Sequence, residues 1–188
     1  MRSRVIFKDS GPGLFGIFDM KVYDIRDGKR KRIRHIHKRN QITNQGREGL
    51  LNLMRPETNS PGDPDTLQRQ NKVWSLSVGT NATPPTINDD DTTMTQVWRS
   101  EFNPFSECQV VVAPPDLFLL QIGKILPETA AVGQVLTEAG VFTRGDADDP
   151  YTAVGRGLYA RQTHPAITKT ATMTIEYDWK LGITIQGS

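Results

Sequence analysis

A strictly alternating segment near the C-terminus constrains the fold more than any other feature of this sequence. Apolar side chains occupy eight consecutive odd positions: Ala171, Met173, Ile175, Tyr177, Trp179, Leu181, Ile183 and Ile185. The even positions between them carry Thr, Glu, Asp, Lys and Gly. A period of two over this length is typical of a long antiparallel strand with one face on a core and one on water. Gly182 is expected to bend this strand so that it serves two sheets.

Other segments rich in β-branched and aromatic residues predict the remaining strands. They cover residues 15–25, 31–38, 73–79, 96–102, 108–113, 117–125, 135–143 and 158–163. Residues 117–125 are the most apolar of these, so we expect them at the centre of a sheet. Gly140 is expected to form a β-bulge within its strand.

The best helix candidate lies in residues 40–54, where Thr43 or Asn44 caps the N-terminus and Pro56 follows the end. Long polar loops separate the elements over residues 57–71, 80–93 and 144–157. Eight or nine strands, one short helix and these loops predict an all-β fold, an antiparallel β-sandwich of jelly-roll-like type. No repeat or linker divides the chain, so residues 1–188 are expected to form one domain.

Composition excludes several classes of protein. Cys108 is the only cysteine, which excludes an intrachain disulfide framework and a multi-cysteine metal site. No apolar run approaches the roughly 18 residues that a membrane-spanning helix needs, so we expect no membrane association. The first five residues show no feature of a secretory signal.

No residue pattern predicts an active site. His35 and His37 share one face of a strand, but no carboxylate or cysteine lies near them in sequence to complete a metal shell. The acidic run 89–91 lacks the spacing of a calcium loop, and local turn formation explains it more simply. Glu138 and Arg161 are expected to form a structural salt bridge. We therefore predict that the chain is not an enzyme and has no catalytic residue, cofactor or metal ligand.

Charge is distributed very unevenly along the chain. The net charge is +2, but residues 1–55 carry 14 Lys/Arg against 5 Asp/Glu, whereas the remainder is acidic. An Asp27-Gly28 turn predicts a basic hairpin or arm at about 26–40. Its candidate interaction residues are Lys29, Arg30, Lys31, Arg32, Arg34, Lys38 and Arg39.

Three explanations fit this basic hairpin. It is a solvated element, or it docks on an acidic surface such as that of a neighbouring copy, or it binds nucleic-acid phosphates in a salt-dependent manner. No aromatic residue lies within 29–39 to stack on bases, which argues against selective single-strand recognition. We predict an assembly surface, with nucleic acid the less favoured partner.

The order of segments resembles that of small virion structural proteins of tailed bacteriophages, namely tail, baseplate and neck accessory proteins. The similarity covers roughly residues 40–185. Its motifs are residues 40–46 leading into Leu50-Leu51, Ser77-Val78-Gly79-Thr80, Thr83-Pro84-Pro85, Asp91-Thr92, residues 136–142, residues 157–161 and the strand carrying Trp179.

This resemblance implies a β-sandwich subunit that assembles as a ring or trimer and attaches to other virion structural proteins. The location it implies is the virion, assembled in the cytoplasm of the bacterial host, and it carries over no catalytic residues. The basic segment 29–39 is not part of the pattern.

Three alternatives remain open. A capsid decoration protein belongs to the same class, whereas a nucleic-acid-binding module using residues 29–39 belongs to another. A carbohydrate-binding or hydrolytic sandwich would need clustered aromatic residues or paired carboxylates in one loop, which the sequence does not show.

Overall fold

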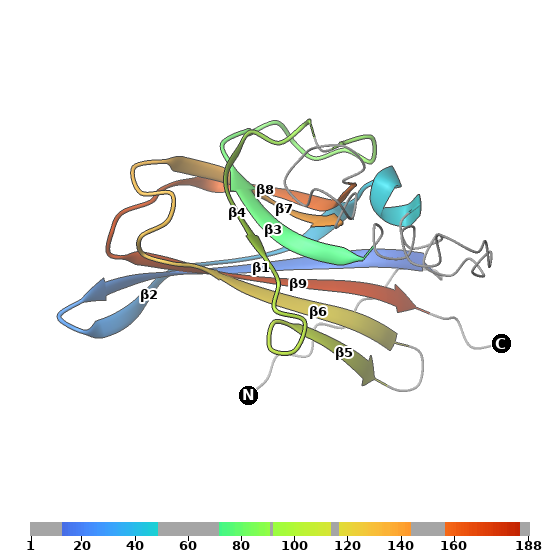
Figure 1. Ribbon diagram of the computed structural model, residues 1–188, viewed down its shortest axis with the longest axis horizontal. Helices are drawn as coiled ribbons and strands as arrows, with labels where there is room; N and C mark the ends of the chain where they lie inside the picture. Colours follow the sequence, from blue (N-terminus) through green and yellow to red (C-terminus); the bar gives the residue numbers. More distant parts are fainter. Residues whose placement is uncertain (1–12, 49–71, 91, 114–116, 144–156, 185–188) are drawn as a thin grey trace, which may run out of the picture.

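A computed structural model describes residues 13–48, 72–90, 92–113, 117–143 and 157–184 as two packed antiparallel sheets (Figure 1). Sheet A has the order β2-β1-β9-β6-β5, and sheet B has the order β4-β3-β7-β8. A short helix begins at Asn44. The strands are β1 (Gly13–Arg26), β2 (Lys29–Ile42), β3 (Val73–Gly79), β4 (Gln96–Glu101), β5 (Cys108–Ala113), β6 (Leu117–Leu126), β7 (Val135–Thr143), β8 (Leu158–Thr168) and β9 (Met173–Thr184). The predicted all-β antiparallel sandwich is confirmed.

Strand pairing is nested, as the jelly-roll-like prediction requires. The first strand pairs with the last, β2 pairs with β8, and β3 pairs with β7. The strand that joins the sheets is β2, because its last residues, Gln41 and Ile42, pair with Arg161 and Ala160 of β8. The expectation that β9 serves two sheets is wrong, since β9 pairs only with β1 and β6 of sheet A. Its regular alternation places Ile175, Tyr177, Trp179 and Leu181 on one face, which ties the strand to one sheet.

The predicted alternation of β9 sets the position of the core. Ile175, Tyr177, Trp179 and Leu181 are at most 5% exposed and face sheet B, whereas the even positions between them are half-buried on the outer face. They pack with Phe18, Met20 and Val22 of β1 and with residues of β3, β7 and β8. Ala171 precedes β9, and Ile185 lies outside the described residues.

Two local expectations are wrong. The apolar segment that forms β6 is second from the edge of sheet A, and β9 is central. Its apolarity reflects burial of one face only, because Ile122 is 1% exposed whereas Ile125 is 52% exposed. Gly140 forms no bulge, since the register irregularities of β7 fall at other positions. A Cβ atom at Gly140 would lie 2.3 Å from the sulfur of Met94, so close packing requires this glycine.

The first two strands form a long hairpin that extends beyond the sandwich (Figure 1). Asp27 and Gly28 have φ values of 51° and 70°, as in a type I′ turn, so the predicted turn is confirmed. The register shifts between Val22 and Tyr23, which face Arg34 and Arg32 respectively. Ile33 is therefore the extra residue of a β-bulge.

The helix begins at the predicted cap. The Oγ1 atom of Thr43 accepts a hydrogen bond from the Gly46 N–H at 3.0 Å, and the Thr43 side chain is fully buried. The rest of the predicted helix, including Leu50 and Leu51, lies outside the described residues. A Cβ atom at Gly46 would lie 2.2 Å from the carbonyl oxygen of Tyr159, so β8 approaches the helix too closely for any side chain.

We expect Gly46→Ala to lower the free energy of unfolding by roughly 1–3 kcal/mol, because the clash involves backbone. This runs against helix propensity, which favours alanine over glycine by about 1 kcal/mol. Urea denaturation measures the change, with Arg47→Ala, an exposed position in the same helix, as the control. A Gly46→Ala variant as stable as the wild type would contradict the close packing.

Candidate interaction surface

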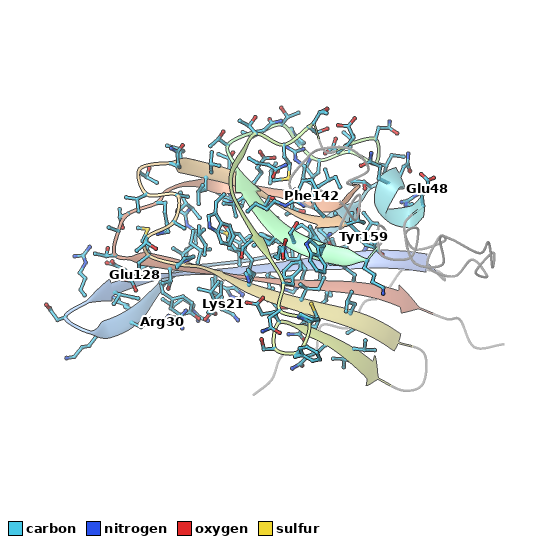
Figure 2. All side chains as sticks on the ribbon, in the orientation of Figure 1. Lys21, Arg30, Glu48, Glu128, Phe142 and Tyr159 are labelled. Carbon is cyan, nitrogen blue, oxygen red and sulfur yellow. The ribbon has the colours of Figure 1, made fainter. Side chains whose placement is uncertain are left out.

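The seven predicted basic residues all lie on β2 and are all exposed. Figure 2 shows Arg30 on the projecting part of the hairpin. They do not form one uniform surface, because four of them already have partners within the fold. The described contacts therefore separate the side chains that stabilise the fold from those that remain available to another molecule.

Arg30 is anchored on the outer face of sheet A. Its Nη2 atom donates to Oε1 of Glu176 at 2.6 Å, and its guanidinium carbon lies 3.6 Å from the ring centroid of Tyr23. The Tyr23 hydroxyl donates to the other Glu176 oxygen at 3.1 Å. Burial raises the pKa of Glu176, but the hydrogen bonds from Arg30 and Tyr23 outweigh it and hold that pKa below its usual value.

Arg34 and Lys38 bind the backbone of β8. The Nη1 atom of Arg34 donates to the carbonyl oxygen of Ala166 at 3.3 Å, and Nζ of Lys38 donates to that of Thr163 at 3.4 Å. These carbonyls follow the two residues of β8 that pair with β2. The two cations therefore help to close this side of the sandwich. Arg39, nearer the base of the hairpin, is not free either.

Three of the seven basic residues have no partner within the described fold: Lys29, Lys31 and Arg32. Their side chains are exposed and form no hydrogen bond or ion pair with any other described residue. All three lie in the four residues that follow the Asp27-Gly28 turn, at the far end of the hairpin. The unpaired positive charge of the predicted site is thus concentrated at its tip.

A carboxylate lies between the two histidines, contrary to what their surroundings in the sequence indicated. Oδ1 of Asp19 is 2.5 Å from Nε2 of His35, and Oδ2 is 3.2 Å from Nδ1 of His37. Burial raises the pKa of Asp19, but the hydrogen bonds from His37 and His35 leave it below its usual value. This side chain was missed because it comes from the neighbouring strand, β1.

A pocket of about 310 Å³ adjoins this cluster on sheet A, over Gly123. Three of its four carboxylates have basic partners in the fold: Asp19 with the histidines, Glu176 with Arg30, and Glu107 with Lys124 at 2.8 Å. Burial raises the pKa of the fourth, Asp178, which accepts a hydrogen bond from Gln121 at 3.1 Å. The outer face of sheet A therefore has mixed charge near its centre, unlike the hairpin tip.

Two residues of the acidic run 89–91 lie in the described part of the chain, Asp89 and Asp90, and both have structural roles. Asp89 binds the buried guanidinium of Arg161 at 2.8 Å. Asp90 accepts hydrogen bonds from the N–H and hydroxyl of Thr92, as expected for a local turn. Across the described ranges, no group of three or more His, Cys, Asp or Glu side chains is arranged to hold a metal ion. No helix in the same ranges has the length and apolarity needed to cross a membrane.

Comparisons with known proteins identified no relative of this chain. No family model matches the chain, and no curated protein or solved structure matches it either.

Proposed function

We propose that this chain is a virion structural protein of the tail, baseplate or neck of a tailed bacteriophage. It would act by assembling with itself, as a ring or trimer, and with other virion proteins in the host cytoplasm. The segment order of residues 40–185 supports the virion assignment through its resemblance to such proteins. The observation that carries assembly by contact is the exposed tip of the hairpin, with Lys29, Lys31 and Arg32.

The construction of the hairpin suits docking on a protein. Its strands are paired from Gly16 and Asn40 to Arg26 and Lys29, apart from the bulge at Ile33, and a two-residue turn closes them. Little conformational entropy is therefore lost on binding. Contacts with the sandwich hold the hairpin in place, through Arg30 with β9 near its tip and through Lys38 with β8 nearer its base. The remaining cations at the tip would meet an acidic surface, where charge complementarity accelerates association and fixes orientation.

Reversing two tip charges with Lys31→Glu/Arg32→Glu should abolish incorporation of the chain into particles while leaving its unfolding midpoint unchanged. Both side chains are exposed and unpaired within the described fold, so only contacts with other molecules are lost. The matched control is Arg47→Glu/Lys72→Glu, which changes the net charge equally at exposed positions outside the hairpin.

Incorporation is measured by immunoblotting of purified particles from infected cells in which a plasmid supplies the only copy of the chain. Normal incorporation of the tip variant would overturn the assembly role of the hairpin. Labelling by immunoelectron microscopy separates a tail, baseplate or neck position from a capsid decoration protein, which would cover the shell.

The same exposed cations favour a second candidate, a module that binds nucleic-acid phosphates. Size exclusion with light scattering, recorded at 260 and 280 nm in low and high salt, tests it directly. We expect a purified chain free of nucleic acid. A salt-sensitive complex that absorbs strongly at 260 nm, lost in the tip variant while particle assembly stays normal, would support the nucleic-acid function instead.

A further inference from the structure

The outermost strand of sheet A, β5, has an open edge. It pairs with β6 on one side, from Cys108 opposite Ile122 to Ala113 opposite Leu117. The N–H of Gly123 donates to the carbonyl of Glu107 at 2.8 Å. Glu107 and Gly123, which adjoin the pair Cys108–Ile122, are therefore a hydrogen-bonded pair. Because hydrogen-bonded and non-hydrogen-bonded pairs alternate in antiparallel strands, the backbone groups of Cys108, Val110 and Val112 point away from β6.

These outward backbone groups have no partner in the described structure. The hydrogen-bonded order of the strands ends at β5, and no other described element contributes a bond to Cys108 or Val110. Three residues, each with one N–H and one C=O, therefore offer six bonding groups in a row. Such a row is a template for one further β-strand.

The β5 edge lacks the features by which proteins normally protect an open strand. Its six residues, Cys-Gln-Val-Val-Val-Ala, include no charge and no proline, and the Val110 side chain is 75% exposed. The strand at the opposite end of the hydrogen-bonded order, β4, carries Arg99 and Glu101. Charged side chains protect such an edge, whereas β-branched residues favour pairing.

We propose that β5 pairs with β5 of a second copy of this chain, antiparallel and around a two-fold axis at Val110. The three outward residues are spaced symmetrically about Val110. In this arrangement Val110 faces Val110 of the second copy, and Cys108 faces Val112 of the second copy. All six outward backbone groups on each chain are then bonded, and the two copies of sheet A form one continuous ten-stranded sheet.

The second copy is favoured as the occupant by the symmetry and neutrality of the strand. Self-pairing around this axis places Val110 opposite Val110 and only uncharged residues opposite the rest of the strand, whereas a charged residue at the axis would meet its own charge. Pairing ends where the sequence continues as Pro114-Pro115, which has no N–H groups to donate. This contact does not use the basic hairpin. It would join two of the proposed rings or trimers and not neighbours within one, because neighbours in such a ring are not related by a two-fold axis.

Light scattering of the purified chain over a wide range of concentration tests the proposal. We expect a dimer, and we expect Val110→Lys to weaken it roughly a hundredfold or more, because two ammonium groups then meet at the axis. The matched control is Gln109→Lys. Gln109 is an exposed neighbour, and in the proposed dimer it does not lie opposite Gln109 of the second copy. Circular dichroism and the unfolding midpoint confirm that each variant is folded.

Mixing separately purified Val110→Lys and Val110→Glu variants should restore a dimer containing one chain of each. Only pairing across the Val110 axis places the two opposite charges together. A wild-type chain that stays monomeric, or a dimer that survives Val110→Lys, would overturn the proposal. So would failure of the two variants to form the mixed dimer.

A covalent experiment gives an independent measurement. Directly opposed hydrogen-bonded residues have Cα atoms about 5.5 Å apart, within the range of a disulfide. Cys108→Ser/Val110→Cys should therefore form a disulfide-linked dimer on mild oxidation. In the control Cys108→Ser/Gln109→Cys, the equivalent Cα atoms would be about 8 Å apart and should remain unlinked. Equal crosslinking of the two variants would contradict the register.

Discussion

Replacing Arg161 by methionine should lower the free energy of unfolding by about 3–5 kcal/mol. Arg161 lies on β8 and is fully buried. Its Nε atom donates to Oε2 of Glu138 and its Nη1 atom to Oδ2 of Asp89, both at 2.8 Å. Glu138 is fully buried and Asp89 is 7% exposed, so removal of the cation leaves two carboxylates without their main partner.

This network also holds the segment between β3 and β4 against sheet B. The second carboxylate oxygen of Glu138 accepts the backbone N–H groups of Asn81 and Thr95, each at 2.9 Å. Arg161 also donates to the carbonyl of Asn81 at 3.4 Å. We therefore expect Arg161→Met to increase amide hydrogen exchange at Asn81 and Thr95 more than in β9.

Urea denaturation measures the change, with Arg47→Met as an exposed control expected within about 0.5 kcal/mol of the wild type. Arg161→Met/Glu138→Gln should recover part of the loss, because glutamine removes one charge and still accepts from both N–H groups. If the single variant were as stable as the wild type, the buried ion pairs would contribute nothing to stability.

The sequence predicted the elements whose signals are local. Asp27-Gly28 specifies a type I′ turn within two residues, and the alternation of β9 needs no knowledge of its neighbours. The expected Glu138–Arg161 salt bridge is confirmed, because both residues lie on adjacent strands at positions that can meet. Two predicted positions failed, the place of β6 at the centre of a sheet and the sharing of β9 between two sheets. Apolarity and alternation report which side chains are buried, and they do not report which strands are neighbours.

The hairpin shows why details of the candidate surface could not be predicted. In a regular hairpin without a bulge, the pairing of Arg26 with Lys29 at the turn would place Asp19 opposite Ile36. The bulge at Ile33 shifts the register by one residue and brings Asp19 opposite His37. A signal for it was present, because the buried Met20 pairs with the half-buried Ile36 only in the shifted register.

The roles of the basic residues were also hidden. The segment 29–39 is identified by composition alone, but the partners of Arg30, Arg34 and Lys38 lie more than 100 residues away in sequence. Only the folded chain shows that these three hold the hairpin against the sandwich, Arg30 near its tip and the other two further along β2. The same contacts leave Lys29, Lys31 and Arg32 as the exposed remainder.

Acidification should destabilise the fold through a histidine inside the core. His164 of β8 is 6% exposed and stacks on Phe18, with ring centroids 6.4 Å apart. Its Nδ1 atom is 3.1 Å from the carbonyl oxygen of Pro165, which can only accept, so the neutral ring carries its proton on Nδ1. The Nε2 atom is buried without a partner among the described residues, so protonation there would create an unpaired charge.

Burial lowers the pKa of His164 to about 4, and the nearby cations Lys38 and Arg34 act in the same direction. The hydrogen bond to Pro165 opposes them without reversing the shift. The unfolded chain titrates near the ordinary value of about 6.5, so it binds the proton first as the pH falls. The stability that depends on neutral His164 is therefore complete above about pH 6.5 and is lost toward pH 4, by about 3 kcal/mol in all.

His164→Phe removes this titration while preserving an aromatic ring against Phe18. Urea denaturation of both proteins between pH 7 and pH 4 should show the wild type losing stability relative to His164→Phe on acidification, with a slope difference approaching about 1.4 kcal/mol per pH unit. Asp19, Glu176 and Asp178 titrate in both proteins, so their contributions cancel in that difference. Parallel curves would mean that His164 is protonated within the folded core, and that water or a rearranged side chain reaches its Nε2 atom.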